Sequence, residues 1–226
     1  LEIVNVASGH GENCNMKYSL IFGILLLVLM APVRAAQNFE QRLLDLQHQW
    51  ATINYETPEA QREDAFAGLA QQAEGLIQAY PQRPEPLVWK GIIVSTWAGA
   101  RGGLGALKLV KEAKSLLEQS LELDPDALSG SAYTSLGSLY YQVPGWPLGF
   151  GDDEQAERLL KQALKVNPDG IDSNYFYADY CLDQGDADQA RIYFEKALQA
   201  PPRPERPLAD AGRRQEILAK LNSIKK

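Results

Sequence analysis

The feature that most constrains the fold of this chain is a spacing of small, aromatic and proline residues near its C-terminal end. Within residues 171–204, Gly185 is followed after 5 residues by the small Ala190 and after 9 by the aromatic Phe194. The small Ala197 follows after 12 residues and Pro202 after 17. Glycine suits a tight turn, small residues let helices approach closely, and proline cannot continue a helix. The spacing therefore predicts two antiparallel helices that pack together and end at the proline.

The second-helix part of this pattern recurs three times upstream. The matching sets are Ala156, Leu160, Ala163 and Pro168; Ala113, Leu117, Ser120 and Pro125; and, in degenerate form, Leu69, Ala73, Leu76 and Pro81. The closing prolines are 44, 43 and 34 residues apart, and the small residues of the preceding helices are Gly91, Gly137 and Ala178. We therefore predict four helix pairs, over residues 38–84, 85–129, 130–170 and 171–204, which share a core by stacking.

A polar amphipathic helix is predicted after the last pair, over residues 209–224. Its apolar side would carry Ala211, Ile217, Leu218 and Leu221, and its outward side Arg213, Arg214, Glu216 and Lys220. Such a helix is typical of an element that caps the end of a helical stack. No alternating strand pattern occurs after residue 35, so the predicted fold class is all-α.

The two middle pairs are longer than the last one, which predicts inserted loops between their helices. About ten residues are added around ARGGLGALK, where we expect a flexible turn before an extended helix from Leu104 to Leu123. About seven are added in VPGWPLGFG, residues 143–151, which hold Trp146 and Phe150. Either these rings fold back onto the helices, or they are exposed and contact a ligand or partner.

The first 35 residues are predicted to direct export. A lysine follows Met16, an apolar run extends from Ile21 to Met30, and small residues fit the cleavage site that ends at Ala35. We predict a signal peptide over residues 16–35, cleaved after Ala35, and interpret residues 1–15 as upstream read-through. An uncleaved membrane anchor is the alternative.

Cleavage would leave a periplasmic chain with little capacity for cysteine or metal chemistry. It would keep one cysteine, Cys181, and one histidine, His48, which can form neither an internal disulfide nor a typical Cys/His zinc site. We expect Cys181 to be an inert core residue and His48 to lie on the surface. No metal, no cofactor and no catalytic residue is predicted.

Charge and motifs also argue against other functions. A net charge of −7 disfavours nucleic acid and anionic lipid as partners. The glycine-rich residues 99–105 lack the Gly-Lys-Ser/Thr of a phosphate-binding loop. The acidic pairs Asp152/Asp153 and Asp183/Asp186 are expected to cap helix N-termini rather than to act as catalytic acids. We therefore predict a binding protein rather than an enzyme.

The concave groove of such a stack and the loop at 143–151 are the predicted binding surfaces. The first helices supply Glu85, Val88, Ile92 and Ser95; Ser131, Thr134, Ser138 and Tyr141; and Asp172, Tyr175, Asp179 and Leu182 to the groove. The candidate partner-binding residues are Val88, Ile92, Thr134, Ser138, Tyr141, Trp146, Phe150, Tyr175 and Asp179. Because this set has no lysine or arginine, a neutral peptide or a small apolar ligand is expected.

The unit at 171–204 resembles the tetratricopeptide repeat (TPR) superfamily. The segments GGLGALKLVKEAKSLLEQSLELDPDAL and SLGSLYYQVPGWPLGFGDDEQAERLLKQALKVNPDG further resemble periplasmic TPR proteins of the T-component family, which is associated with TRAP-type solute transporters. The resemblance implies a TPR-type helical-hairpin solenoid that partners a periplasmic solute-binding protein, with possible self-association. The chain departs from that family because no cysteine lies directly after the apolar run, so no stable membrane anchor is expected.

Two functions follow from the sequence. The first is a periplasmic protein–protein interaction module, a scaffold or adaptor of an envelope or transport complex. The alternative is a small-molecule carrier that assists a solute transporter.

Overall fold

A computed structural model describes residues 38–224 of the chain. The chain divides into two units, Leu1–Arg42 and Leu43–Lys226. Of the first unit only residues 38–42 are described, and these begin a helix that continues to residue 55. The predicted signal peptide and cleavage site lie outside the described residues. The contacts and cavities described below belong to the second unit.

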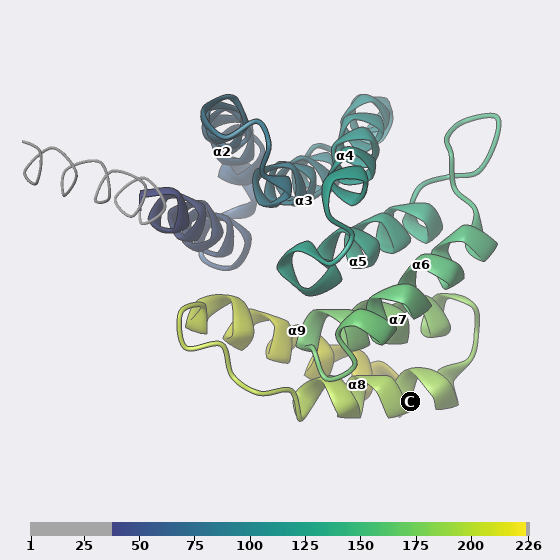
Figure 1. Ribbon diagram of the computed structural model, residues 1–226. Helices are drawn as coiled ribbons and strands as arrows, with labels where there is room; N and C mark the ends of the chain where they lie inside the picture. The colour runs from purple at the N-terminus through teal and green to yellow at the C-terminus, as the bar shows by residue number, and fades with distance from the viewer. Residues whose placement is uncertain (1–37, 225–226) are drawn as a thin grey trace, which may run out of the picture. The chain divides into compact units, whose positions relative to one another are not determined.

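Helices follow one another along the whole described part of the chain, and no strand occurs among residues 38–224 (Figure 1). After the helix at 38–55 come α2 (Glu59–Ala79), α3 (Pro84–Arg101), α4 (Gly103–Leu123), α5 (Ala127–Gln142), α6 (Asp153–Val166), α7 (Ile171–Asp183), α8 (Ala187–Leu198) and α9 (Pro207–Ile224). The most extensive contacts join α3 to α4, α5 to α6 and α7 to α8. The helices therefore form consecutive pairs, and the predicted all-α class is confirmed.

The first helices of the pairs form a layer of their own. α3 contacts α5, and α5 contacts α7, whereas α4, α6 and α8 do not contact one another in this way. The helix at 38–55 joins the same layer, because Trp50 packs against Trp89 of α3 with ring centroids 6.0 Å apart. α9 lies against α7 and α8 at the end of the chain (Figure 1).

Small residues bring the helices of each pair close together, as the spacing predicts. A Cβ atom added at Gly91 would lie 2.7 Å from Cγ of Leu117, and one added at Gly137 would lie 2.6 Å from Cγ of Leu160. Both leucines are fully buried. Each glycine therefore leaves the space that a leucine of the facing helix fills, which is the reason for a small residue in the first helix and a larger one in the second.

The turn between α7 and α8 shows why a glycine is needed there. Gly185 has φ of +83°, which residues with a Cβ atom rarely adopt. The Gly185 N–H donates to the Leu182 carbonyl at 3.1 Å, and the Asp186 N–H donates to the Cys181 carbonyl at 2.8 Å. This pair of bonds is a Schellman motif, which satisfies the last carbonyls of α7.

Aspartates cap the helices that follow the turns, although not all four predicted acids do so. Asp186 accepts a hydrogen bond from the Gln189 N–H at 3.0 Å, and Asp152 accepts one from the Gln155 N–H at 2.9 Å. The Asp186 N–H itself donates to the Cys181 carbonyl in the turn. Asp183 is the last residue of α7, so its predicted place at a helix N-terminus is wrong.

The extended helix predicted from Leu104 to Leu123 is confirmed by α4, but the inserted residues before it form no loop. α3 continues to Arg101 and α4 begins at Gly103, so only Gly102 separates them. Gly102 and Gly103 have φ of +65° and +58°, which reverses the chain within two residues. The inserted residues therefore lengthen both helices. The second insertion is a true loop between α5 and α6.

The predicted orientation of α9 is right for Ile217 and Leu221, which are buried, and wrong for three other residues. Arg213, expected to face outward, is buried, whereas Ala211 and Leu218, expected to face inward, are exposed. The reason is a contact with the first helix: a Cβ atom at Gly212 would lie 2.4 Å from the ring of Tyr55. His48 Nε2 also lies 2.5 Å from the Glu205 carbonyl oxygen. α9 and the segment before it thus reach back to the helix at 38–55.

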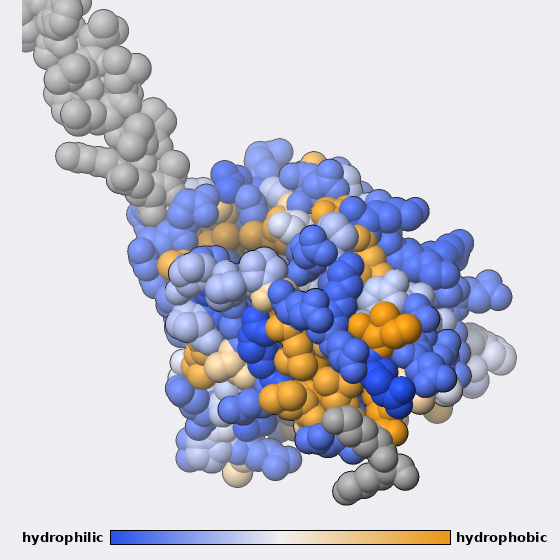
Figure 2. All heavy atoms as spheres, turned by 90° about the horizontal axis from the view of Figure 1, so that it is seen from below, coloured by the Kyte–Doolittle hydropathy of each residue, from blue (hydrophilic) through white to orange (hydrophobic). Residues whose placement is uncertain are grey.

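The surface is predominantly polar. On the face seen from below, hydrophilic residues surround a group of hydrophobic ones (Figure 2). Two large apolar side chains of the C-terminal helices are exposed, Ile192 of α8 and Leu218 of α9. Among the described residues, no helix has the length and apolar character needed to cross a membrane.

Candidate functional site

Two neighbouring cavities lie along the layer of first helices. The smaller has a volume of about 110 Å³ and the larger about 650 Å³. Six residues line both: Trp50, Ser95, Thr96, Ser138, Phe176 and Arg213. The two cavities therefore form adjoining compartments of one hollow, bounded by the helix at 38–55, α3, α5, α7 and α9.

Aromatic rings form much of the wall of the smaller cavity. Trp50, Tyr55 and Trp89 come from the N-terminal helices, and Phe176 comes from α7. Trp50 makes edge-to-face contacts with Tyr55 and Trp89, at centroid distances of 5.9 and 6.0 Å. Its indole N–H donates to the Thr96 hydroxyl at 3.1 Å, which fixes the ring. The wall is thus a rigid apolar surface of the kind that organic ligands contact.

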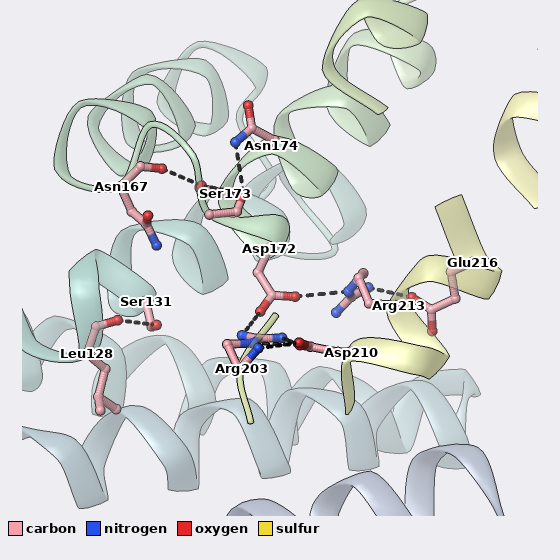
Figure 3. A network of polar contacts seen from close by, with 11 residues as sticks. Leu128, Ser131, Asn167, Asp172, Ser173, Asn174, Arg203, Asp210, Arg213 and Glu216 are labelled. Carbon is pink, nitrogen blue, oxygen red and sulfur yellow. Dashed lines mark hydrogen bonds and ion pairs between the residues drawn. The ribbon is translucent and has the colours of Figure 1, made fainter. Parts of the chain in front are cut away.

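Hydroxyl groups line the rest of the smaller cavity. They belong to Ser95 and Thr96 of α3 and to Ser131, Thr134, Ser135 and Ser138 of α5. The Ser131 hydroxyl donates to the Leu128 carbonyl at 2.6 Å (Figure 3). Leu128 has φ of +49° and begins a short left-handed segment, so the regular part of α5 starts at Ser131.

An ion-pair network closes the C-terminal side of the cavity (Figure 3). Asp172 of α7 accepts hydrogen bonds from Arg203 Nη1 at 2.8 Å and from Arg213 Nε at 2.9 Å. Arg203 also donates to Asp210 at 2.7 Å, and Arg213 pairs with Glu216. Charged hydrogen bonds of this kind are strong when their geometry is good. The network therefore fastens α9 and the preceding segment to α7.

The network keeps Asp172 and Arg213 ionised. Burial alone raises the pKa of Asp172, but the guanidinium groups of Arg213 and Arg203 outweigh it and hold the pKa well below its ordinary value. Burial lowers the pKa of Arg213, but Asp172 and Glu216 outweigh it and raise the pKa. Arg213 also lies over the rings of Tyr175 and Phe176, at 4.2 and 4.8 Å from their centroids. This arginine is thus both paired and stacked.

Five of the predicted binding residues line the cavities. Ile92, Thr134 and Ser138 line the smaller one, and Ser138, Tyr175 and Asp179 line the larger. Val88 does not: it is fully buried in the core, and its predicted contact with a partner is wrong. The reason is that α3 packs against α2, α4 and α5, which leaves only a narrow strip of its surface free.

Tyr141 lies outside the residues that line the two cavities. Its hydroxyl donates to Asp179 at 2.8 Å, and Asp179 forms an ion pair with Lys220 of α9. Burial, followed by the charge of Asp179, raises the pKa of Tyr141 well above its ordinary value. Tyr141 and Asp179 therefore join α5, α7 and α9, and Asp179 alone of the two reaches a cavity.

The two aromatic rings of the loop at 143–151 differ in their surroundings: one packs against the helices and the other is exposed. Phe150 folds back against Tyr140, with centroids 5.4 Å apart and Lys114 near both rings. Trp146, in contrast, is 90% exposed, and the neighbouring Leu148 is 64% exposed. The loop is braced by backbone bonds, including one from the Gly151 N–H to the Pro144 carbonyl at 3.0 Å.

The arginines of the cavity were not predicted from the sequence. Arg203, Arg206 and Arg213 all line the smaller compartment, so the expectation of a groove without basic residues is wrong. The repeats alone define the predicted groove positions, whereas these arginines follow the last repeat. A signal existed: four arginines occur within residues 203–214 of an acidic chain.

Comparison with known proteins identifies the repeat in the C-terminal half of the chain. Residues 148–212 match the family model described as tetratricopeptide repeat. No curated protein matches the chain. Three of the solved structures that are similar to the chain share 18–21% identity with it. MamA is 20% identical with a TM-score of 0.43, and the match covers 76% of this chain and 94% of MamA. TTC0263, a TPR protein of Thermus thermophilus, is 21% identical with a TM-score of 0.43, and the match covers 81% of this chain and 99% of TTC0263. Yeast Tom70 is 18% identical with a TM-score of 0.44, and the match covers 83% of this chain and 38% of Tom70.

The helix pairs and the family match define the class of protein. The fold is an all-α helical solenoid of the TPR type, and residues 148–212 carry the recognisable repeat sequence. The resemblance of the unit at 171–204 to the tetratricopeptide repeat is thereby confirmed. The finer resemblance to the T-component family finds no counterpart among these similar proteins and stays a prediction. Among the described residues, no cluster of three or more His, Cys, Asp or Glu side chains is placed to hold a metal ion.

Proposed function

We propose that this chain is an exported, periplasmic interaction module that binds another protein through the tip of the loop at 143–151. The observation that carries this proposal is the exposure of Trp146, 90%, beside Leu148 at 64%. Tryptophan is the residue type most enriched at the energetic centres of protein interfaces. Exposure of a large apolar ring to water is unfavourable, and a partner that covers the ring would explain why the loop holds it there.

The rest of the loop makes it a suitable anchor. Phe150 packs on Tyr140, and the Asp152 N–H donates to the Tyr140 carbonyl at 2.9 Å, so both ends of the loop are fastened to α5. A fastened loop loses less conformational freedom on binding than a mobile one, so more of the contact energy remains as affinity. Pro144 and Pro147 restrict the backbone further.

Export is the second part of the proposal, and it depends on residues 16–35. A basic residue, an apolar run and small residues in this order favour a signal peptide cleaved after Ala35. The mass of the protein recovered from a periplasmic fraction tests this directly. A chain that begins at Ala36 supports export, and a full-length chain confined to the cytoplasm contradicts it.

The partner is proposed to be a protein of the same compartment. The resemblance to the T-component family favours a solute-binding protein, which would make the chain an adaptor of a transport complex. The net charge of −7 argues against nucleic acid. A tryptophan and a leucine at the tip suit an apolar pocket on the partner.

Photocrosslinking from the loop tests the interaction. A photoreactive amino acid in place of Leu148 should give a defined adduct in intact cells, and Trp146→Ala should abolish it. Trp146→Ala should change the free energy of unfolding by no more than about 0.5 kcal/mol, since the side chain packs on little. Leu104→Ala is the matched control, because Leu104 is an apolar side chain that is 84% exposed at another place.

Two outcomes would contradict the interaction at the loop. One is the absence of any adduct from the position of Leu148. The other is an adduct that Trp146→Ala and Leu104→Ala weaken equally, because contact at the loop requires the loop variant alone to matter.

A second candidate function is a carrier of a small molecule, and the smaller cavity favours it. The smaller compartment is walled by rings and hydroxyls, and it is closed on one side where Gly212 of α9 meets Tyr55. Such a space suits a small ligand better than an extended peptide. Native mass spectrometry of the protein purified from cells should then show an additional organic mass, which denaturation releases.

A further inference from the structure

One arginine of the C-terminal segment differs from its neighbours in forming no ion pair. Arg203 is paired with Asp172 and Asp210, and Arg213 with Asp172 and Glu216. Within the described residues, Arg206 has no ion pair, and its Nε is buried without a hydrogen-bond partner. A guanidinium can donate five hydrogen bonds, so this side chain retains unused donors inside the protein.

Arg206 is held in place by contacts that do not neutralise it. Its guanidinium lies over the ring of Trp89, 4.9 Å from the centroid, and Trp89 is itself buried. Burial, followed by repulsion from Arg203, lowers the pKa of Arg206 below its ordinary value. The surroundings therefore destabilise the positive charge, and a negative group placed beside it would remove that penalty.

Hydroxyl donors without partners face the same space. Ser95, Thr96 and Ser131 already donate to backbone carbonyls. In the described part of the chain, by contrast, the hydroxyls of Thr134, Ser135 and Ser138 have no hydrogen bond, although all three line the smaller cavity. These groups lie on α5, a different element from Arg206. Two elements thus present free donors to one cavity.

We propose that the smaller cavity binds the carboxylate of a small organic acid, with Arg206 as the charge partner and the α5 hydroxyls as additional donors. This inference rests on the second proposed function, the carrier, and names the chemistry of its ligand. A planar guanidinium pairs with a carboxylate through two parallel hydrogen bonds. The rings of Trp50, Trp89 and Phe176 then contact the carbon part of the acid.

The dimensions and walls favour an organic anion over an inorganic one. A cavity of about 150 Å³ lined by apolar groups holds a benzene ring, so the volume of about 110 Å³ found here holds a ligand of a few heavy atoms. A longer carbon chain has room in the adjoining compartment of about 650 Å³, whose lining includes Phe66, Val110 and Leu139. Phosphate or sulfate would leave the aromatic walls without contacts.

Matched pairs of small molecules test the proposal on the purified full chain. Propionate and hexanoate are compared with propionamide and hexanamide, which have nearly the same shape and no charge, and inorganic phosphate is the third arm. Isothermal titration and tryptophan fluorescence report binding, since Trp50 and Trp89 line the cavity. We expect one of the carboxylates to bind at least about tenfold more tightly than its amide and than phosphate.

Variants assign that binding to Arg206. Arg206→Gln keeps most of the length of the side chain and should weaken carboxylate binding at least about tenfold, while Arg206→Lys should restore part of it. Arg191→Gln is the control, because Arg191 is an exposed arginine of α8 that pairs with Asp188. Without ligand, Arg206→Gln should unfold at the same temperature as the wild type or higher, because it removes a half-buried charge that forms no ion pair and whose Nε has no hydrogen-bond partner. A purely structural arginine would show a lower melting temperature.

Several results would overturn the proposal. They are the absence of carboxylate binding at about 10 mM, equal affinity for an acid and its amide, affinity for phosphate equal to that for the acids, and undiminished binding by Arg206→Gln. The test is independent of the protein partner. Trp146→Ala should leave carboxylate binding unchanged, and Arg206→Gln should leave the Leu148 adduct unchanged, so failure of one proposal does not imply failure of the other.

Discussion

Replacing Asp172 by Asn is the most informative change in stability, because it removes one charge and little volume. Asp172 accepts two charged hydrogen bonds, from Arg203 Nη1 at 2.8 Å and Arg213 Nε at 2.9 Å. Each bond of this type contributes about 1.5–3 kcal/mol when buried. The side chain is 33% exposed, and both arginines keep a second carboxylate, so the lower part of that range applies. We expect Asp172→Asn to lower the free energy of unfolding by about 2–3 kcal/mol at pH 7.

The pH dependence of this loss follows from the direction of the pKa shift. The pKa of Asp172 is lower in the folded state than in the unfolded state, where it is about 3.9. Its contribution to stability is therefore fully present above about pH 4 and decreases as the pH falls below that value. Each pH unit below about 4 should remove about 1.4 kcal/mol of the difference between wild type and variant, until the folded-state pKa is reached.

Urea unfolding followed by circular dichroism at pH 7 and pH 3 measures both effects. Glu157→Gln is the control, because Glu157 and Lys161 form a surface pair at 2.7 Å with both side chains about half exposed. That variant should lose less than about 0.5 kcal/mol at either pH. The reasoning would be refuted if Asp172→Asn lost no more than the control at pH 7, or if its loss were the same at pH 3.

Three further changes test the packing, the turn and the cysteine. Gly137→Ala should destabilise the wild type by about 1–2 kcal/mol, because the added Cβ meets Leu160. In a Leu160→Ala background the same change should be neutral or stabilising. A double-mutant cycle measured by urea unfolding tests this difference. Asp186→Ala should lower stability by about 1 kcal/mol in the same assay, since Asp186 caps α8, and a loss above about 3 kcal/mol would point to a role beyond capping. Cys181 should react with a thiol reagent at pH 8 only after the protein unfolds, because the side chain is buried and burial raises its pKa to about 11. Rapid reaction of the native protein would contradict this.

The architecture could be read from local spacings because the contacts that define it repeat. Gly137 and Leu160 lie in adjacent helices, and the same small-to-large relation recurs in Gly91 and Leu117. The period of the pattern therefore reports both the helices and their pairing. The turn at Gly185 and the cap at Asp186 were predictable for the same reason, because each involves residues only a few positions apart.

The insertions show where local interpretation fails. Both were expected to be loops, yet the residues around Gly102 lengthen α3 and α4. Two glycines with positive φ make a very short reversal possible, but nothing in their spacing decides between a short turn and a long loop. In the loop at 143–151, composition suggested a function for both rings, and packing against Tyr140 removed Phe150 from that role.

The sequence by itself determined the helical pairs, their turns and the general place of the hollow, because these depend on residues close together in the chain. Only the tertiary structure decided what the hollow contains. Arg206 and Arg213 follow the last repeat, and they reach the cavity because α9 packs back against Tyr55. Asp172 and Arg213 are 41 residues apart, so no local pattern reveals that they meet. The surroundings of a half-buried charge that forms no ion pair, such as that of Arg206, depend on which elements close around it, and that is a property of the folded chain.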